Sequence, residues 1–268
     1  VSATAGSISA KTPVGTAGEK SVVVTSVGGV STKAGAFTYV PVPTIASVSP
    51  SSGPLVGGTA ITIAGANLAG AKVTIDGIAT TIVSATAGSI SAKTPVGTAG
   101  AKSVVVTTVG GSAAKAAAFT YVPVPTIASV SPSAGPLVGG TTITITGANL
   151  AGAAVTVDGK AATSVVATAL SISAKVPAGT AGAKNVVVTT VGGSATKTGA
   201  FAYVPLPTIT GVSPSSGPMV GGTSITITGT NLAGAKVTID GKAATGVVAS
   251  AASISATAPA GTVGAKGV

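Results

Sequence analysis

Four acidic side chains are the main groups in this sequence suited to acid–base chemistry: Glu19, Asp76, Asp158 and Asp240. The sequence contains no histidine, cysteine, arginine or tryptophan. General acid–base catalysis needs titratable groups placed within reach of the reacting atoms. Serine and threonine are plentiful, but an ordinary nucleophilic triad requires histidine. A Ser–Lys pair is the one alternative left, and no motif supports it. The sequence therefore predicts no catalytic residue and a protein that is not an enzyme.

The three aspartates have a structural explanation. Asp76, Asp158 and Asp240 are spaced by 82 residues, and each is followed by glycine and flanked by apolar runs. Asp-Gly between such runs predicts a two-residue hairpin, because that turn needs positive φ. A calcium site needs about six to eight oxygen ligands. With one acid per repeat, we expect no metal site and no cofactor-binding residues.

The basic residues are all lysines, and they give a formal net charge of +10. They are spread evenly through two successive repeats, at Lys72, Lys93, Lys102, Lys115, Lys160, Lys175, Lys184 and Lys197. Bidentate contacts to bases or phosphates favour arginine, and nucleic-acid binding favours a basic cluster with interleaved aromatics. Neither is present, so we expect no nucleic-acid partner. Weak attraction to acidic polysaccharide or to an anionic cell envelope stays open.

An internal repeat organises the whole chain. The segment 43–50 recurs from Pro125 and, with small changes, from Pro207, and segments 43–124 and 125–206 are identical at 64 of 82 positions. A fixed period of this kind indicates a tandem array. The predicted division is a partial domain (C-terminal part), two whole domains and a second partial domain (N-terminal part): 1–42, 43–124, 125–206 and 207–268.

Both ends of the sequence fall inside a repeat. Residues 1–42 match 83–124, and residues 207–268 match 125–186. There is no initiator methionine or signal peptide, so we expect a segment of a longer repetitive protein. Residues 1–42 supply late strands and 207–268 supply early ones. A neighbouring chain that completes these half-domains is therefore a hypothesis raised by the sequence.

Composition predicts a chain that packs closely with its neighbours. Charged residues are 7% of the sequence, against roughly 25% in ordinary soluble domains. Such a surface opposes close contact only weakly, so we expect a homo-oligomer or polymer. Residues 34–71 carry no charge, but Gly, Pro, Ser and Thr interrupt them. A membrane-spanning helix needs about 20 mostly apolar residues in one run, so none is expected.

Seven short strands are predicted in one repeat. Their residue ranges are 44–48, 59–63, 72–75, 80–83, 89–93, 102–108 and 118–121. Turn residues separate them every 8–12 residues or so, which is typical of an antiparallel β-sandwich. The β-branched run 102–108 is the expected central strand. Phe119 and Tyr121 share one face of the last strand and are expected in the core.

Three further predictions concern single segments of the repeat. The edge strand 44–48 alternates weakly, and places Ile45 on one face and Val48 on the other. Residues 51–54 read as a turn, since they combine Ser, Gly and Pro. The hairpin at Asp76-Gly77 is expected to return through residues 80–83.

In order along the chain, these motifs resemble the IPT/TIG family of immunoglobulin-like domains. The resemblance rests on segments 43–54, 57–59, 61–65, Asn67, 76–77, Pro95 with Gly97, 104–106, 110–111 and 119–121. Leu68, Leu150 and Leu232 depart from it, because many members carry an aromatic residue there. The resemblance implies an all-β chain of tandem immunoglobulin-like β-sandwich domains. Short linkers with two prolines, as in 121–125, lead us to expect that the domains are arranged as a rod.

Two functions are compatible with this reading. The first is a structural repeat segment of a bacterial extracellular filament, sheath or adhesin stalk, located outside the cell or on its surface and self-associating through its sandwiches. The alternative is a spacer or binding module that presents a ligand-binding or catalytic domain outside this segment, with weak affinity for acidic polysaccharide. Fold alone does not decide between them.

Overall fold

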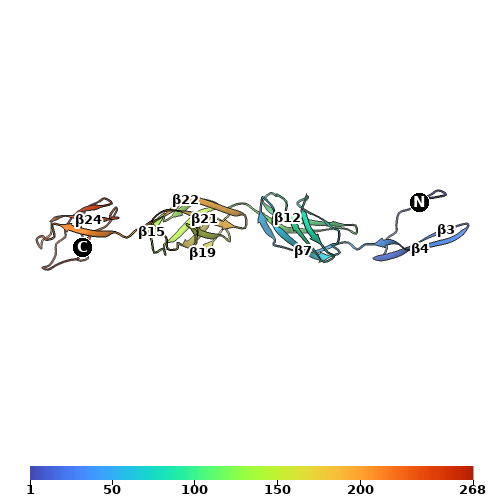
Figure 1. Cartoon of the computed structure of the whole chain (residues 1–268), viewed down its shortest axis with the longest axis horizontal. Coiled ribbons are helices and arrows are strands. Elements are labelled where there is room, and N and C mark those ends of the chain that lie inside the picture. Colours follow the sequence, from blue (N-terminus) through green and yellow to red (C-terminus); the bar gives the residue numbers. More distant parts are fainter. Residues whose placement is uncertain (268) are drawn as a thin grey trace. The chain divides into compact units, whose positions relative to one another are not determined.

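The computed structural model describes residues 1–267, and they form β-strands, turns and loops without a helix. No helix long and apolar enough to cross a membrane occurs in that range. The chain divides into two compact units, residues 1–124 with 191–193, and the remaining residues. Figure 1 shows the strands of each unit along the sequence. The all-β fold class is confirmed.

The sandwich of residues 43–124, in the first unit, contains nine strands in two sheets. One sheet has the order β10-β11-β7-β5 and the other β6-β13-β12-β8-β9. The pairings are antiparallel except for β6 with β13, which is parallel. The strands are β5 (Thr44–Ser49), β6 (Ser52–Pro54), β7 (Ala60–Ala66), β8 (Lys72–Ile75), β9 (Ile78–Ala79), β10 (Thr81–Ala85), β11 (Ser89–Lys93), β12 (Gly100–Thr108) and β13 (Gly111–Val122).

Local chemistry explains the hairpin between β8 and β9. Asp76 and Gly77 have φ of 53° and 82°, as a type I′ turn requires. The predicted hairpin is confirmed, but its return strand is not residues 80–83. Ile78 and Ala79 return instead, and the chain then crosses to the other sheet as β10, which pairs with β11. The predicted return strand is divided in two because one chain must supply strands to both sheets of the sandwich.

Two further predictions about this sandwich are wrong. Residues 52–54, expected to be a turn, form β6 on the edge of a sheet, beside β13. The register of β5 with β7 shifts between Ile45 and Ser47. This β-bulge inserts one residue and changes the alternation, so Ile45 and Val48 both pack against the core. The prediction that residues 44–48 form an edge strand is confirmed, because β5 is the last strand of its sheet.

The core is aliphatic, with one aromatic pair. Ile61 and Ile63 share the inner face of β7, and both are buried. Phe119 and Tyr121 pack inside at an interplanar angle of 76°. Leu68, which follows β7, is fully buried. The strand β12 lies at the centre of its sheet, which confirms the expectation for the β-branched run.

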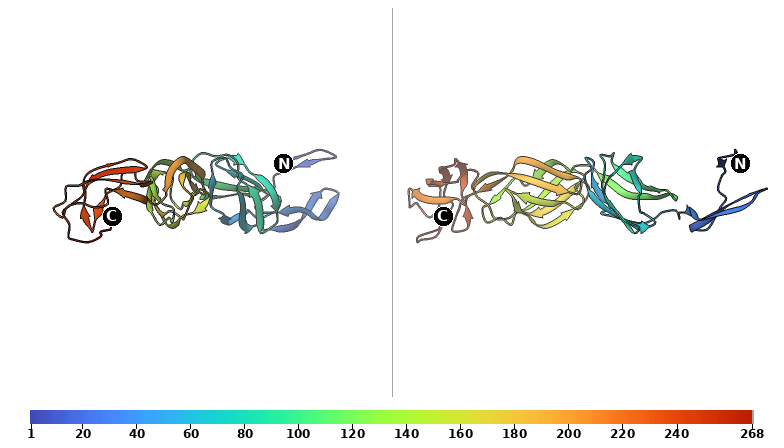
Figure 2. Two further views of the ribbon diagram at one scale, coloured as in Figure 1. Left: turned by 60° about the vertical axis from the view of Figure 1, so that its left-hand side comes forward. Right: turned by 45° about the vertical axis from the view of Figure 1, so that its right-hand side comes forward.

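Residues 1–42 belong to the first unit and form two separate hairpins (Figure 2). Their strands are β1 (Ser2–Ala3), β2 (Ile8–Ser9), β3 (Gly18–Ser26) and β4 (Gly29–Tyr39). The pair β3–β4 repeats the register of β12–β13, including the shift after Lys20 that matches the one after Lys102. It forms a sheet of only two strands in the described chain.

The second unit begins with a sandwich of the same design. Its sheets have the orders β14-β16-β20-β19 and β15-β22-β21-β17-β18. The strands are β14 (Thr126–Ser131), β15 (Ala134–Pro136), β16 (Thr142–Ala148), β17 (Ala154–Val157), β18 (Lys160–Ala161), β19 (Thr163–Ala167), β20 (Ser171–Lys175), β21 (Gly182–Thr190) and β22 (Gly193–Val204). Its core repeats the same positions, with Phe201 and Tyr203 as the aromatic pair.

Residues 207–267 form one complete sheet of this design and a fragment of the other. The first has the order β23-β24-β28-β27, and the second is reduced to β25-β26 in the described residues. The strands are β23 (Thr208–Ser213), β24 (Ser224–Thr230), β25 (Thr238–Ile239), β26 (Lys242–Ala243), β27 (Thr245–Ala249) and β28 (Ser253–Thr257). A smaller apolar cluster lies between them.

Candidate functional site

The three hairpin aspartates are engaged in structural contacts. Each has positive φ, and its carboxylate forms an ion pair with a lysine 26 residues later. The Nζ–Oδ2 distances are 2.9 Å for Lys102–Asp76, 3.2 Å for Lys184–Asp158 and 3.3 Å for Lys266–Asp240. The sequence predicted the turns but not the ion pairs, because each lysine lies 26 residues further along the chain and meets its aspartate only in the folded domain.

Metal binding finds no support in the described part of the chain. Among residues 1–267 no group of three His, Cys, Asp or Glu side chains is close enough to hold an ion. Glu19 lies on β3 in the N-terminal hairpin and belongs to none of the three turns. The expectations of no metal, cofactor or catalytic residue remain predictions.

The aromatic pair of each sandwich is part of the core. The Tyr121 hydroxyl donates a 2.6 Å hydrogen bond to the Pro95 carbonyl oxygen, which ties β13 to the loop before β12. Burial raises the pKa of the Tyr121 phenol; a hydrogen bond with Thr94 opposes this rise and the charge of Asp76 adds to it. Burial also raises the pKa of Tyr203. These rings fix the core rather than offering a ligand platform.

The lysines are distributed along strands and loops, and several are held by local contacts. Lys102 and Lys184 donate to Thr98 and Thr180 in addition to their ion pairs. Lys197 donates to the Ala128 carbonyl oxygen at 3.0 Å. The ammonium groups are therefore spaced along the domains, and they do not form the arginine-rich surface that specific nucleic-acid contacts use.

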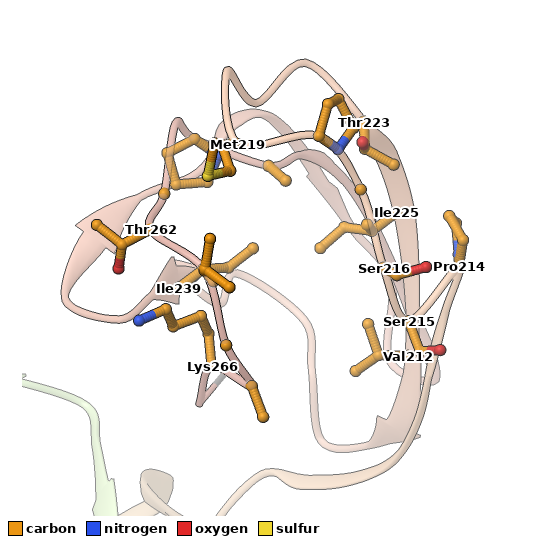
Figure 3. A pocket seen from close by; sticks show the side chains of 18 residues that line it. Val212, Pro214, Ser215, Ser216, Met219, Thr223, Ile225, Ile239, Thr262 and Lys266 are labelled. Carbon is orange, nitrogen blue, oxygen red and sulfur yellow. The ribbon is translucent and has the colours of Figure 1, made fainter.

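A cavity lies in the half-formed sandwich 207–267 of the second unit. It has a volume of about 680 Å³. Figure 3 shows Val212 and Ile225 from the complete sheet facing toward Ile239 from the fragment. Met219 and Lys266 line the same cavity. Apart from Lys266, its lining contains no ionisable side chain, so the cavity resembles an open core more than a site for chemistry. In the sequence, only the phase of the repeat, which makes residues 207–268 a partial domain, pointed to this cavity.

Each whole domain consists of two sheets packed face to face, and one edge strand pairs in parallel with its neighbour. This arrangement defines the domains as immunoglobulin-like β-sandwiches. The chain belongs to the IPT/TIG domain family: the model of the IPT/TIG domain matches residues 43–121, 125–203 and 207–268. The family resemblance drawn from the motifs is confirmed.

Several solved structures match this chain at low sequence identity. The plexin A4 full extracellular region is 24% identical over 83% of this chain, with a TM-score of 0.44. SGBP-B from a complex xyloglucan utilisation locus in Bacteroides uniformis is 21% identical over 72% of this chain, with a TM-score of 0.31. Invasin, a bacterial integrin-binding protein, is 19% identical over 82% of this chain, with a TM-score of 0.26. This chain spans 21%, 58% and 55% of those chains.

Proposed function

We propose that this chain is a structural repeat segment of a bacterial extracellular filament, sheath or adhesin stalk. One observation carries the proposal: the two whole sandwiches preserve the same core and differ mainly on their surfaces, with 64 of 82 positions identical. An enzyme or receptor needs one distinguished site. Near-copies that each bury their own core supply length and valency instead.

The proposed domain division follows the repeat. Residues 43–124 and 125–206 each form one domain, and residues 1–42 and 207–268 are parts of two more. The low charge leaves sheet edges such as β5 and β14 with little repulsion to prevent lateral contact. We also propose that copies of this chain self-associate through these edges.

Electron microscopy of the purified chain at physiological salt tests self-association. Ordered filaments or tubes with a regular axial repeat are the expected result. Isolated particles at every concentration would remove lateral assembly and leave the chain as a spacer that presents another domain. A variant with one Lys on each of the edge strands β5 and β14, Ser47→Lys with Ser129→Lys, is expected to dissolve the assemblies without unfolding the sandwiches.

Binding to an acidic polysaccharide is a second candidate, favoured by the charge distribution. Three of the four acidic residues are already paired with lysine, and the net charge of +10 is spread over the remaining surface. Retention on immobilised polygalacturonate is expected to be weak and to disappear as salt screens the charges. Retention that persists in high salt would contradict a purely electrostatic contact, and no retention at low salt would exclude this candidate.

A further inference from the structure

The linker that leads into the first whole sandwich, residues 40–43, packs against the Gly-Gly turn between β12 and β13. A Cβ on Gly110 would overlap the carbonyl oxygen of Pro41, and a Cβ on Gly111 would lie 3.1 Å from Cγ1 of Val42. Of these two glycines only Gly111 has positive φ, at 133°. The close approach of the linker, and not the shape of the turn, therefore excludes a side chain at Gly110.

An asparagine of the same sandwich holds the next carbonyl group of the linker. Asn67 Nδ2 donates a 3.0 Å hydrogen bond to the Val42 carbonyl oxygen. Its backbone has φ of 59°, a conformation that asparagine adopts more readily than most residues. Pro43, which follows, is buried. The turn and the asparagine therefore contact successive peptide groups of one short segment.

The turn of the second sandwich makes the same contacts with the linker before it, residues 122–125. A Cβ on Gly192 would overlap the Pro123 carbonyl oxygen, and a Cβ on Gly193 would lie 3.1 Å from Cγ1 of Val124. Residues 191–193 accordingly belong to the same compact unit as this linker. The contact is thus a property of the repeat.

The asparagine also recurs in each repeat. Asn149 and Asn231 both have φ of 57°. Asn231 Nδ2 donates to the Leu206 carbonyl oxygen at 3.2 Å, which matches the bond of Asn67 with Val42. By this equivalence, Asn149 is the asparagine that faces the linker between the two whole sandwiches.

This linker has few torsions that could act as a hinge. Val122 is still paired with Pro54 in the register of β13 with β6, and Thr126 already pairs with Ala148. Only residues 123–125 lie between them, and two of the three are prolines, whose rings fix φ. A hinge needs residues that absorb changes in φ and ψ. Here the remaining freedom lies mainly in ψ, which sets the direction of each carbonyl group.

We propose that the Gly-Gly turn and the asparagine of a sandwich clamp the linker that precedes it, so that this junction does not act as a hinge. The prolines restrict φ, and the clamp restricts ψ because it holds the carbonyl groups. Domains joined by a linker move relative to each other by default, and the clamp removes this motion without a large interface. The inference concerns a single chain and is independent of the lateral association in the proposed function.

The distribution of distances between two spin labels tests the clamp. The sequence contains no cysteine, so Thr62→Cys with Thr144→Cys supplies the only labelled positions. These residues are equivalent and exposed, on β7 and β16, and each sandwich therefore carries one label. A narrow distribution is expected for the chain with an intact clamp. A broad distribution in that chain would overturn the proposal.

Two variants open the clamp from different sides. Gly192→Ala places a Cβ against the Pro123 carbonyl oxygen, and Asn149→Gly keeps a residue that adopts positive φ while it removes the amide donor. Each is expected to widen the distribution about twofold or more, toward that of a flexible linker. Ser194→Ala is the control in the same hairpin, because its hydroxyl contacts Thr189 at 2.9 Å. It is expected to leave the width unchanged.

Thermal unfolding of each variant establishes that the sandwich of residues 125–206 stays folded. If Gly192→Ala disrupts this domain, Asn149→Gly carries the test, because it adds no atom to the junction. Folded variants with a distribution as narrow as that of the intact chain, or a control as broad as the variants, would overturn the clamp. Ordered filaments built from a chain with a broad distribution would support the proposed function and still overturn this inference.

Discussion

At the scale of single residues, the hairpin aspartates combine a backbone role with a weak electrostatic one. Asp76 has φ of 53°, and its carboxylate, half exposed, pairs with Lys102. Exposed pairs contribute about 0.5 kcal/mol, whereas Asn adopts positive φ more readily than Ala. We expect Asp76→Asn to cost at most about 0.5 kcal/mol and Asp76→Ala about 1 kcal/mol more, measured by urea unfolding. Equal losses would contradict the backbone role.

The buried phenols predict a loss of stability in alkali. Burial raises the pKa of Tyr121 and of Tyr203 above the ordinary value of 10.0. A raised pKa in the folded state means that folding retains the proton, so this contribution is complete below pH 10 and declines as pH rises through the folded pKa. Tyr121→Phe with Tyr203→Phe is expected to flatten the pH dependence of unfolding above about pH 10. A double variant that keeps the full pH dependence of the wild type would contradict this.

At the scale of strands, the approach of β5 to β7 depends on one glycine in each repeat. A Cβ on Gly65 would overlap the Thr44 carbonyl oxygen, which is backbone and cannot rotate away. Gly65→Ala is expected to destabilise the domain by about 2 kcal/mol. Gly88→Ala is the matched control, because the equivalent positions hold Leu170 and Ala252. Thermal unfolding checks both, and a harmless Gly65→Ala would mean that the two strands can separate.

The predictable parts of the strands were those encoded by neighbours in sequence. The β-branched run 102–108 located the central strand, and the Asp76-Gly77 pair located a turn, because both signals are local. The crossing of the chain to the second sheet after Ala79 depends on a partner strand about ten residues further on, so no local pattern revealed it. The bulge after Ile45 likewise inserts a residue that alternation cannot show. The lysine partners of the aspartates were hidden for the same reason.

At the scale of the whole molecule, the two whole sandwiches have separate cores built at largely equivalent positions. The buried cluster of residues 43–124 shares no member with that of residues 125–206. Near-identical neighbours also carry a hazard, because strands of one repeat can pair with those of the next during folding. Independent cores limit this hazard once each domain has closed, and they allow one domain to open without the other.

The separate cores predict that damage to one sandwich stays within it. Phe119 and Phe201 are fully buried, and truncation of such a side chain to alanine costs about 3–5 kcal/mol. Phe119→Ala is expected to lower the stability of residues 43–124 alone, and Phe201→Ala that of residues 125–206 alone. Hydrogen exchange, which resolves the amides of β12 from those of β21, measures each domain separately. If either variant exposes both sandwiches equally, they unfold as one cooperative body, and the chain is not a string of independently stable domains.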